Sequence, residues 1–154
     1  MADSGLNITR RKKWMAVLAK ADWEQLDTLW QQSKLKQSYD LVRGPETGLI
    51  MAQGRMGGSG APFNVGEVTV TRCTVRLAES NVLGHAYVMG RNKKHAETAA
   101  LLDGLMQDPS LGPRVSEDII APLQQVYAAR RQHMQAKAAA TKVDFFTLVR
   151  GEDD

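Results

Sequence analysis

The sequence predicts an α+β fold built on an antiparallel sheet of about four strands. An N-terminal helical hairpin, a packing helix and a long C-terminal helical arm with an apolar tail complete the prediction. Helical periodicity is found toward the two ends of the chain, and alternating strand-like runs occupy its middle. These runs follow one another through short turns, which leaves no room for the helical crossovers of a parallel sheet. At 154 residues the chain fits one domain, which we place at residues 10–154, after a flexible tail at residues 1–9.

The first helix is predicted from apolar residues at spacings of three and four, namely Trp14, Val17, Leu18 and Ala21. A basic run at residues 10–13 precedes it, which imitates the start of a secretion signal. The apolar run ends at Lys20 after six residues, so we interpret the segment as a helix of a cytoplasmic protein. Asp22, with Gln25 three positions later, resembles a capping box and predicts the start of a second helix.

Composition limits the class of protein. No apolar run approaches the roughly 18 residues that cross a membrane. The formal net charge of +3 is too small to indicate nucleic-acid binding by itself. The single cysteine, Cys73, cannot form an internal disulfide, which suits a reducing compartment. We therefore expect a cytoplasmic protein that binds neither membranes nor nucleic acid.

The candidate strands lie at residues 38–43, 47–54, 66–77 and 82–89. Gly44 and Pro45 separate the first pair, and a polar group at residues 79–81 separates the last pair. Cys73 lies in the middle of the third run, where a cysteine is more often a small core residue than a reactive thiol.

Two further helices are expected after the strands. A packing helix should begin at Asn92, a favourable N-cap residue, and end at about Gln107. Ser116 should cap a longer helix, because the two acidic residues that follow it suit the positive end of the helix dipole. Beyond about Arg130 the apolar stripe fades, so this helix either projects from the domain or lies against something else.

The C-terminal arm, residues 115–151, is expected to make subunit contacts. Its end, residues 143–150, is apolar, and both an intramolecular closing strand and docking onto a partner chain are consistent with it. Two adjacent phenylalanines cannot both face one side of a strand. The candidate partner-binding residues are Phe145, Phe146, Val149 and Arg150.

A glycine-rich loop carries the first candidate site. Arg55 is followed by Gly57, Gly58 and Gly60, and glycines allow a backbone to expose successive N–H groups that hold an anion. Arg55 would add a planar fork for a phosphate or phosphonate group. A flexible hairpin loop between two strands explains the same residues, and neither the P-loop nor the dinucleotide-binding pattern is matched.

A second candidate site lies where the last strand leads into the packing helix. Free N–H groups at a helix start attract anions, and Arg91 and His95 flank this start together with two lysines. A solvated basic turn is the alternative. Arg72, in the third candidate strand, is a further candidate anion contact, or else it pairs with Glu46 or Glu67.

No metal site and no nucleophilic centre is expected. His95 and Glu97 are two positions apart on a helix and cannot grip one metal together. The Pro-Cys-x-x-Cys pair of zinc deaminases is absent, as is the Gly-x-Ser-x-Gly elbow of hydrolases. The chain therefore offers anion contacts without an acid–base pair. This suggests a component that binds an anionic group while another protein carries out the bond-breaking step.

Several short segments, taken together, resemble the PhnG family. They are residues 46–49, the loop at residues 55–60, Gly66-Glu67 with Thr69, Thr71 and Arg72, residues 75–77, Gly90-Arg91 with His95-Ala96-Glu97, and Asp144-Phe145-Phe146-Thr147 with Val149-Arg150-Gly151. The resemblance covers roughly residues 14–151 in the family's order. Each segment is short, and the combination is specific.

The resemblance implies a role in a multi-subunit transferase. PhnG proteins are small subunits of the bacterial carbon–phosphorus lyase core complex. With PhnH, PhnI and PhnL they transfer the ribose 5-triphosphate part of ATP to methylphosphonate and release adenine, and PhnJ later breaks the carbon–phosphorus bond. By resemblance, ATP and an alkylphosphonate are substrates of the complex, this chain alone binds no cofactor, and the catalytic centre lies on a partner, PhnI. A structural adaptor without substrate contacts is the alternative.

Overall fold

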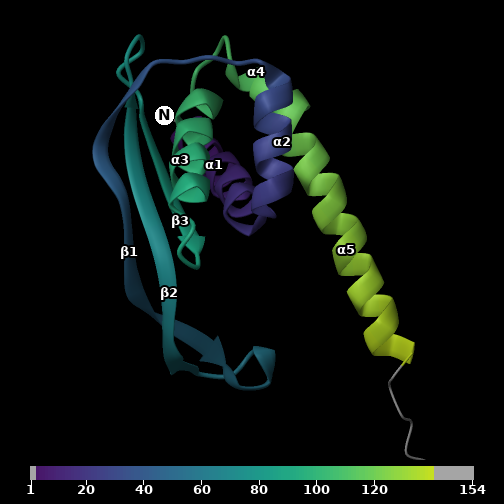
Figure 1. Cartoon of the computed structure of the whole chain (residues 1–154). Coiled ribbons are helices and arrows are strands. Elements are labelled where there is room, and N and C mark those ends of the chain that lie inside the picture. Colours follow the sequence, from purple (N-terminus) through teal and green to yellow (C-terminus); the bar gives the residue numbers. More distant parts are fainter. Residues whose placement is uncertain (1–2, 141–154) are drawn as a thin grey trace, which may run out of the picture.

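The computed structural model describes residues 3–140 and has the predicted α+β class (Figure 1). Its elements are α1 (Asp3–Lys20), α2 (Trp23–Ser33), β1 (Tyr39–Arg55), the 3-10 turn η1 (Met56–Gly58), β2 (Pro62–Leu77), β3 (Leu83–Met89), α3 (Lys93–Met106), α4 (Gly112–Val115), the π-helical segment η2 (Ser116–Ile120) and α5 (Ala121–Ala140). The apolar tail expected at residues 143–150 lies outside the described residues. None of the helices described is long and apolar enough to span a bilayer.

The sheet has three antiparallel strands in the order β1-β2-β3, so the expected count of about four is wrong. The first two predicted strands are one, because β1 continues through Gly44 and Pro45. The register of β1 against β2 shifts between Arg43 and Glu46. Such an irregularity in an edge strand accommodates a proline, which has no N–H to donate to the ladder.

β1 and β2 extend well beyond β3. β3 pairs only with residues 70–76 of β2, whereas the pairing of β1 with β2 continues to Arg55 and Pro62. Residues 49–69 therefore form a two-stranded ribbon, which we call the hairpin arm. In Figure 1 it continues past the lower end of α3 and curls at its tip.

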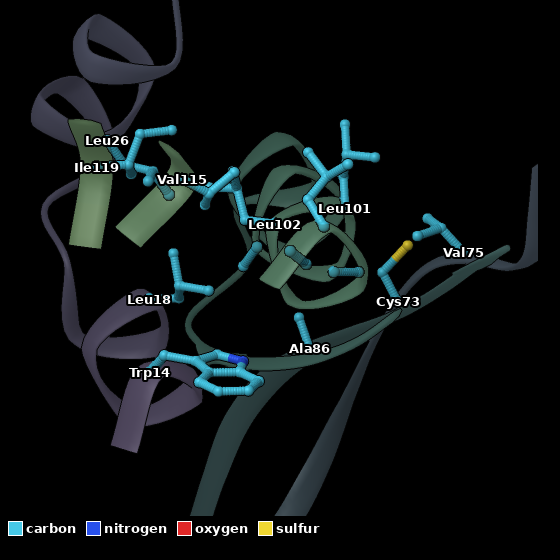
Figure 2. Close-up of a cluster of buried hydrophobic side chains, with 14 of the residues drawn as sticks. Trp14, Leu18, Leu26, Cys73, Val75, Ala86, Leu101, Leu102, Val115 and Ile119 are labelled. Carbon is cyan, nitrogen blue, oxygen red and sulfur yellow. The ribbon is translucent and has the colours of Figure 1, made fainter. Parts of the chain in front are cut away.

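The helices cover one face of the sheet. α3 lies directly on β2 and β3, and α1, α2 and α4 pack around it (Figure 1). Figure 2 shows the resulting core, in which Trp14 and Leu18 of α1 approach Leu102 of α3 and Ala86 of β3. Cys73 belongs to this core with 2% of its surface exposed, so its predicted structural placement is confirmed. The apolar stripe predicted for the first helix also faces the core.

α3 and the sheet approach closely at Gly84. A Cβ atom at this position would collide with the backbone carbonyl of Ala100, and Gly104 of α3 similarly faces the side chain of Leu77. Small residues at a helix–sheet contact let the two backbones come together. This contact fixes the distance between the helical layer and the sheet.

A buried carboxylate joins three elements. Asp103 of α3 has no exposed surface and accepts hydrogen bonds from Arg11 Nη2 at 2.7 Å, Trp14 Nε1 at 2.9 Å and the backbone N–H of His85 at 2.9 Å. Arg11 Nε donates a further bond at 3.1 Å. α1, β3 and α3 are therefore held together by one charged group whose oxygens are all used.

Two predicted helix boundaries are corrected. α1 begins at Asp3, inside the expected flexible tail, because a helix once started extends at little cost where no proline intervenes. Ser116 is not an N-cap, since it lies within a continuous helical run from Gly112 to Ala140. Pro113 occupies the first turn of that run, where its missing N–H costs nothing.

Candidate functional site

The glycine-rich loop closes the tip of the hairpin arm. Gly57 and Gly58 have φ values of 62° and 83°, which a glycine adopts without strain. The N–H of Gly60 donates to the Met56 carbonyl at 2.8 Å, and Arg55 Nη1 donates to the Gly60 carbonyl at 3.2 Å. The loop is thus a hairpin connection, and Arg55 contributes to closing it.

Arg72 lies on the face of the sheet opposite the helices. Its Nη2 and Nε atoms donate to one oxygen of Glu46 at 3.1 Å and 3.3 Å, so the alternative of pairing with Glu46 is confirmed. This hydrogen bond is the main cause that raises the pKa of Arg72 above its ordinary value. The pair borders a shallow hollow of about 180 Å³ that Ile50, Val70 and Tyr87 also line.

The start of α3 is built around its cap. Asn92 is the N-cap as predicted, and its Oδ1 accepts from the backbone N–H of His95 at 3.0 Å. The ring of His95 is buried, its Nε2 donates to the Leu18 carbonyl at 2.8 Å, and it packs near Trp23 with ring centroids 6.1 Å apart. His95 therefore ties α3 to α1 and does not face solvent.

Arg91 differs from the other predicted cations. It is exposed between β3 and α3, and among residues 3–140 it takes part in none of the ion pairs. The adjacent Gly90 is pinned to β2, because its N–H donates to the Thr69 carbonyl at 2.9 Å and its carbonyl accepts from Thr71 Oγ1 at 2.8 Å. A rigid turn thus presents Arg91 to solvent.

The predicted cations do not converge on one site. In the register of β1 and β2, Arg55 lies opposite Pro62, and Glu46 lies opposite Arg72. Pro62 and Arg72 are ten positions apart along β2, which corresponds to about 33 Å at a rise of about 3.3 Å per residue, so Arg55 is far from Arg72. His95 points into the helical core instead. These residues therefore do not form one binding site, and any contact that each of them makes with an anion is a separate one.

The hairpin arm carries an apolar surface that the sequence reasoning missed. Six of its large apolar side chains are between 45% and 75% exposed, namely Leu49, Ile50, Met51, Met56, Phe63 and Val65. Leu49, Ile50 and Met51 are consecutive, so they place apolar side chains on both faces of a ribbon that no helix covers. That run without alternation is the signal in the sequence. Exposed apolar surface of this kind marks interaction sites.

One buried group, Cys73, and one partly buried group, Tyr39, are held in their neutral forms. Burial, with a smaller effect from the charge of Glu97, raises the pKa of the Cys73 thiol to about 11. Burial and the hydrogen bond that Tyr39 donates to Glu97 at 2.7 Å raise the pKa of Tyr39 to about 12. Neither group is poised as an acid, base or nucleophile near neutral pH.

The remaining buried polar groups also serve the core. Ser33 donates to the Trp30 carbonyl at 2.7 Å, and Thr71 contacts Thr47 at 3.0 Å. Within the part of the chain that the structure describes, no buried side-chain polar atom lacks a partner, and no cluster of three metal-binding side chains occurs. The polar groups thus stabilise the fold, and the surfaces left for interaction are the hairpin arm, the outer sheet face and α5.

The candidate partner-binding residues Phe145, Phe146, Val149 and Arg150 lie outside the described residues. The helix that leads to them is described, and it projects from the domain, which is one of the two alternatives expected for it. Every residue from Gln124 to Ala140 is exposed, and α5 leaves the domain as an arm (Figure 1).

Comparison with known proteins gives consistent matches over nearly the whole chain. The model of the family "Phosphonate metabolism protein PhnG" matches residues 9–151. A curated relative from Rhizobium meliloti (strain 1021), "Alpha-D-ribose 1-methylphosphonate 5-triphosphate synthase subunit PhnG", is 43% identical over 149 residues, which cover 95% of this chain and 92% of the relative. Since both matches span nearly its full length, the chain belongs to the PhnG family of phosphonate metabolism proteins.

Proposed function

We propose that this chain is a subunit of an α-D-ribose 1-methylphosphonate 5-triphosphate synthase and works there with PhnH, PhnI and PhnL. In the proposed reaction an oxygen of the phosphonate forms a bond to the anomeric carbon of ATP. The bond between that carbon and adenine breaks, and adenine leaves with the electron pair and takes up a proton. ATP and methylphosphonate are the substrates, and this chain binds no cofactor of its own. PhnJ breaks the carbon–phosphorus bond in a later step of this proposal.

The observation that carries the proposal is that the buried polar side chains are bonded within the domain, whereas many apolar side chains are exposed on its surface. The buried polar side chains are used within the core, as Asp103 and His95 illustrate. The largest group of exposed apolar side chains lies on the hairpin arm, and others lie on the outer sheet face and α5. A chain with this division is suited to bind other proteins, and the curated relative is named as a synthase subunit. We therefore assign bond cleavage to a partner subunit, PhnI.

Arg91 is the residue proposed to contact an anion, either of the substrate or of a partner. Its position on a rigid turn and its lack of an ion pair among the described residues support this role. A guanidinium fixed beside a developing charge stabilises it without reorganisation. In this proposal Arg55 and Arg72 support the surfaces around them through the bonds to Gly60 and Glu46.

A purely structural adaptor is the second candidate, favoured by the intramolecular bonds of Arg55, Arg72 and His95. The decisive measurement is adenine release from ATP and methylphosphonate by purified PhnH, PhnI and PhnL, with this chain added or withheld. We expect release only when the chain is present. Equal release without it would reject the subunit role.

The Arg91→Ala variant separates the two candidates. If Arg91 contacts substrate, the variant complex assembles normally and its rate of adenine release falls. If the chain is an adaptor, the variant has normal activity whenever it assembles. Lys36→Ala, at an exposed position outside the candidate anion sites, is the control for the loss of one positive charge.

A further inference from the structure

The projecting part of α5 has one chemically distinct face. Pro122 is the last proline before Ala140, and no acidic residue occurs between Ile119 and Ala140. Lys20 of α1 and six residues of α5 line a hollow of about 430 Å³, namely Tyr127, Arg130, Arg131, Met134, Gln135 and Ala138. These positions are spaced by three or four residues, which places them on one side of the helix. We call this surface the α5 groove.

The α5 groove combines an apolar seam with positive charge. Tyr127 and Met134 are 42% and 63% exposed, and with Ala138 they repeat at the spacing of a helix–helix contact. The Nζ atom of Lys20 lies 5.3 Å from the centre of the Tyr127 ring. Arg130 and Arg131 interrupt the seam, and neither takes part in an ion pair within residues 3–140.

An isolated helix with this exposure gains little from its own domain. From Gln124 onward every described residue is exposed, whereas most helices in proteins gain their stability by packing an amphipathic face against other elements. Its good helix formers keep it extended, but Met134 is 63% exposed, and Arg130 and Arg131 take part in no ion pair within residues 3–140. A partner surface that supplies both apolar contacts and carboxylates would complete it.

We propose that the α5 groove binds an acidic amphipathic helix of a partner subunit, in which apolar side chains meet Tyr127 and Met134 and carboxylates meet Arg130 and Arg131. Charge complementarity identifies the occupant, since opposite charges placed across an interface steer association and select the partner. A second copy of the groove would place arginine against arginine, which is unfavourable. The inference rests on the proposed function, because it requires partner subunits.

The test uses two variants of equal net charge. Arg130→Gln/Arg131→Gln removes two positive charges from the groove. Gln125→Glu/Gln132→Glu adds two negative charges on the opposite side of the same helix, because these positions lie about 140–160° around the helix from Tyr127. Both changes lower the net charge by two. The affinity of each full-length chain for a stoichiometric mixture of PhnH, PhnI and PhnL is measured by titration at two salt concentrations.

We expect the groove variant to bind about tenfold or more weakly than the wild-type chain, with a smaller dependence of affinity on salt. The control should bind as the wild type does, and both variants should keep the same helix content and midpoint of thermal unfolding. Equal affinities of the groove variant and the control would overturn the inference. The occupant of the groove would then be something other than a partner helix, such as residues 141–154 or a second copy, or the groove would be empty.

Three further outcomes have distinct meanings. Failure of the wild-type chain to associate with any of the three subunits would overturn both the proposed function and the inference. Normal wild-type assembly with adenine release, together with unchanged affinity of the groove variant, would overturn the inference alone. Binding of a single-stranded RNA oligonucleotide that only the groove variant loses, with unchanged subunit affinity, would assign the groove to nucleic acid and reject the acidic helix.

Discussion

Asp103 is the residue on which the docking of α1 most directly depends. Its carboxylate is fully buried and accepts from Arg11, Trp14 and the backbone of His85. An amide in its place has one acceptor oxygen and would turn an NH2 group toward these donors. Replacing Asp103 would leave the charge of Arg11 without its partner. Removing one partner of a buried ion pair lowers stability by more than the intact pair contributes.

We therefore predict that Asp103→Asn lowers the free energy of unfolding by about 3–5 kcal/mol, measured by urea denaturation. Glu97→Gln is the control, because an amide oxygen there still accepts the hydrogen bond from Tyr39, and it should cost less than about 1 kcal/mol. Similar losses for the two variants would contradict the assigned role of Asp103.

Cys73 and Tyr39 give the fold an alkaline limit. The pKa of Cys73 is raised from 9.0 to about 11, and that of Tyr39 from 10.0 to about 12, mainly by burial. Each group stays neutral in the folded chain at a pH where the unfolded chain ionises. The stability that they contribute is therefore complete below about pH 9 and is lost as the pH rises through 11 to 12.

Alkylation of Cys73 with iodoacetamide measures this effect directly, because only the thiolate reacts. At pH 9 about 1% of the native thiol and about half of the unfolded thiol should be ionised, so we expect native alkylation to be at least about fiftyfold slower. A native rate that reaches half of its maximum near pH 9 would refute the raised pKa.

At the scale of elements, capping residues and apolar stripes could be predicted because their information is local. Asp22 and Asn92 cap the helices assigned to them. The continuation of β1 through Gly44 and Pro45 could not be predicted, because it depends on a register shift against β2. The same holds for His95, whose contact with the Leu18 carbonyl joins residues 77 positions apart.

The contact between α3 and β3 is the most demanding element contact for side-chain size. Gly84→Ala would push its methyl group into the Ala100 carbonyl, which is backbone and cannot rotate away. We predict a loss of about 2–3 kcal/mol in the free energy of unfolding, measured by urea denaturation. Gly48→Ala is the control, since its added methyl group meets nothing within 4 Å, and it should change stability by less than about 0.5 kcal/mol. Equal free energies of unfolding for Gly84→Ala and Gly48→Ala would show that α3 moves to make room for the added methyl group, and would contradict the prediction.

For the whole molecule, the fold separates a compact helical layer on the sheet from two projecting arms. The sequence indicated the helical arm through its fading apolar stripe after Arg130. The hairpin arm was missed, because the run of Leu49, Ile50 and Met51 without alternation was assigned to a covered sheet, as strand-like runs ordinarily are. The outer part of β1 and β2 has no covering layer because β3 pairs with residues 70–76 of β2 and no further. Both arms extend the surface available to other subunits beyond that of the domain itself.

The hairpin arm should therefore matter for assembly and little for folding. Leu49→Thr/Met51→Thr replaces two exposed apolar side chains by a polar residue that still favours strands. We predict that the midpoint of thermal unfolding moves by less than about 2 °C, since neither side chain is buried. Binding to purified PhnH, PhnI and PhnL should weaken about tenfold or more, because a few apolar side chains dominate most interfaces. Gln53→Thr/Asn64→Thr, a polar pair on the same ribbon, should leave binding unchanged. If the apolar variant bound as tightly as this control, the hairpin arm would have to be a solvent-exposed extension, and the subunit contacts would have to lie on α5 and the outer sheet face.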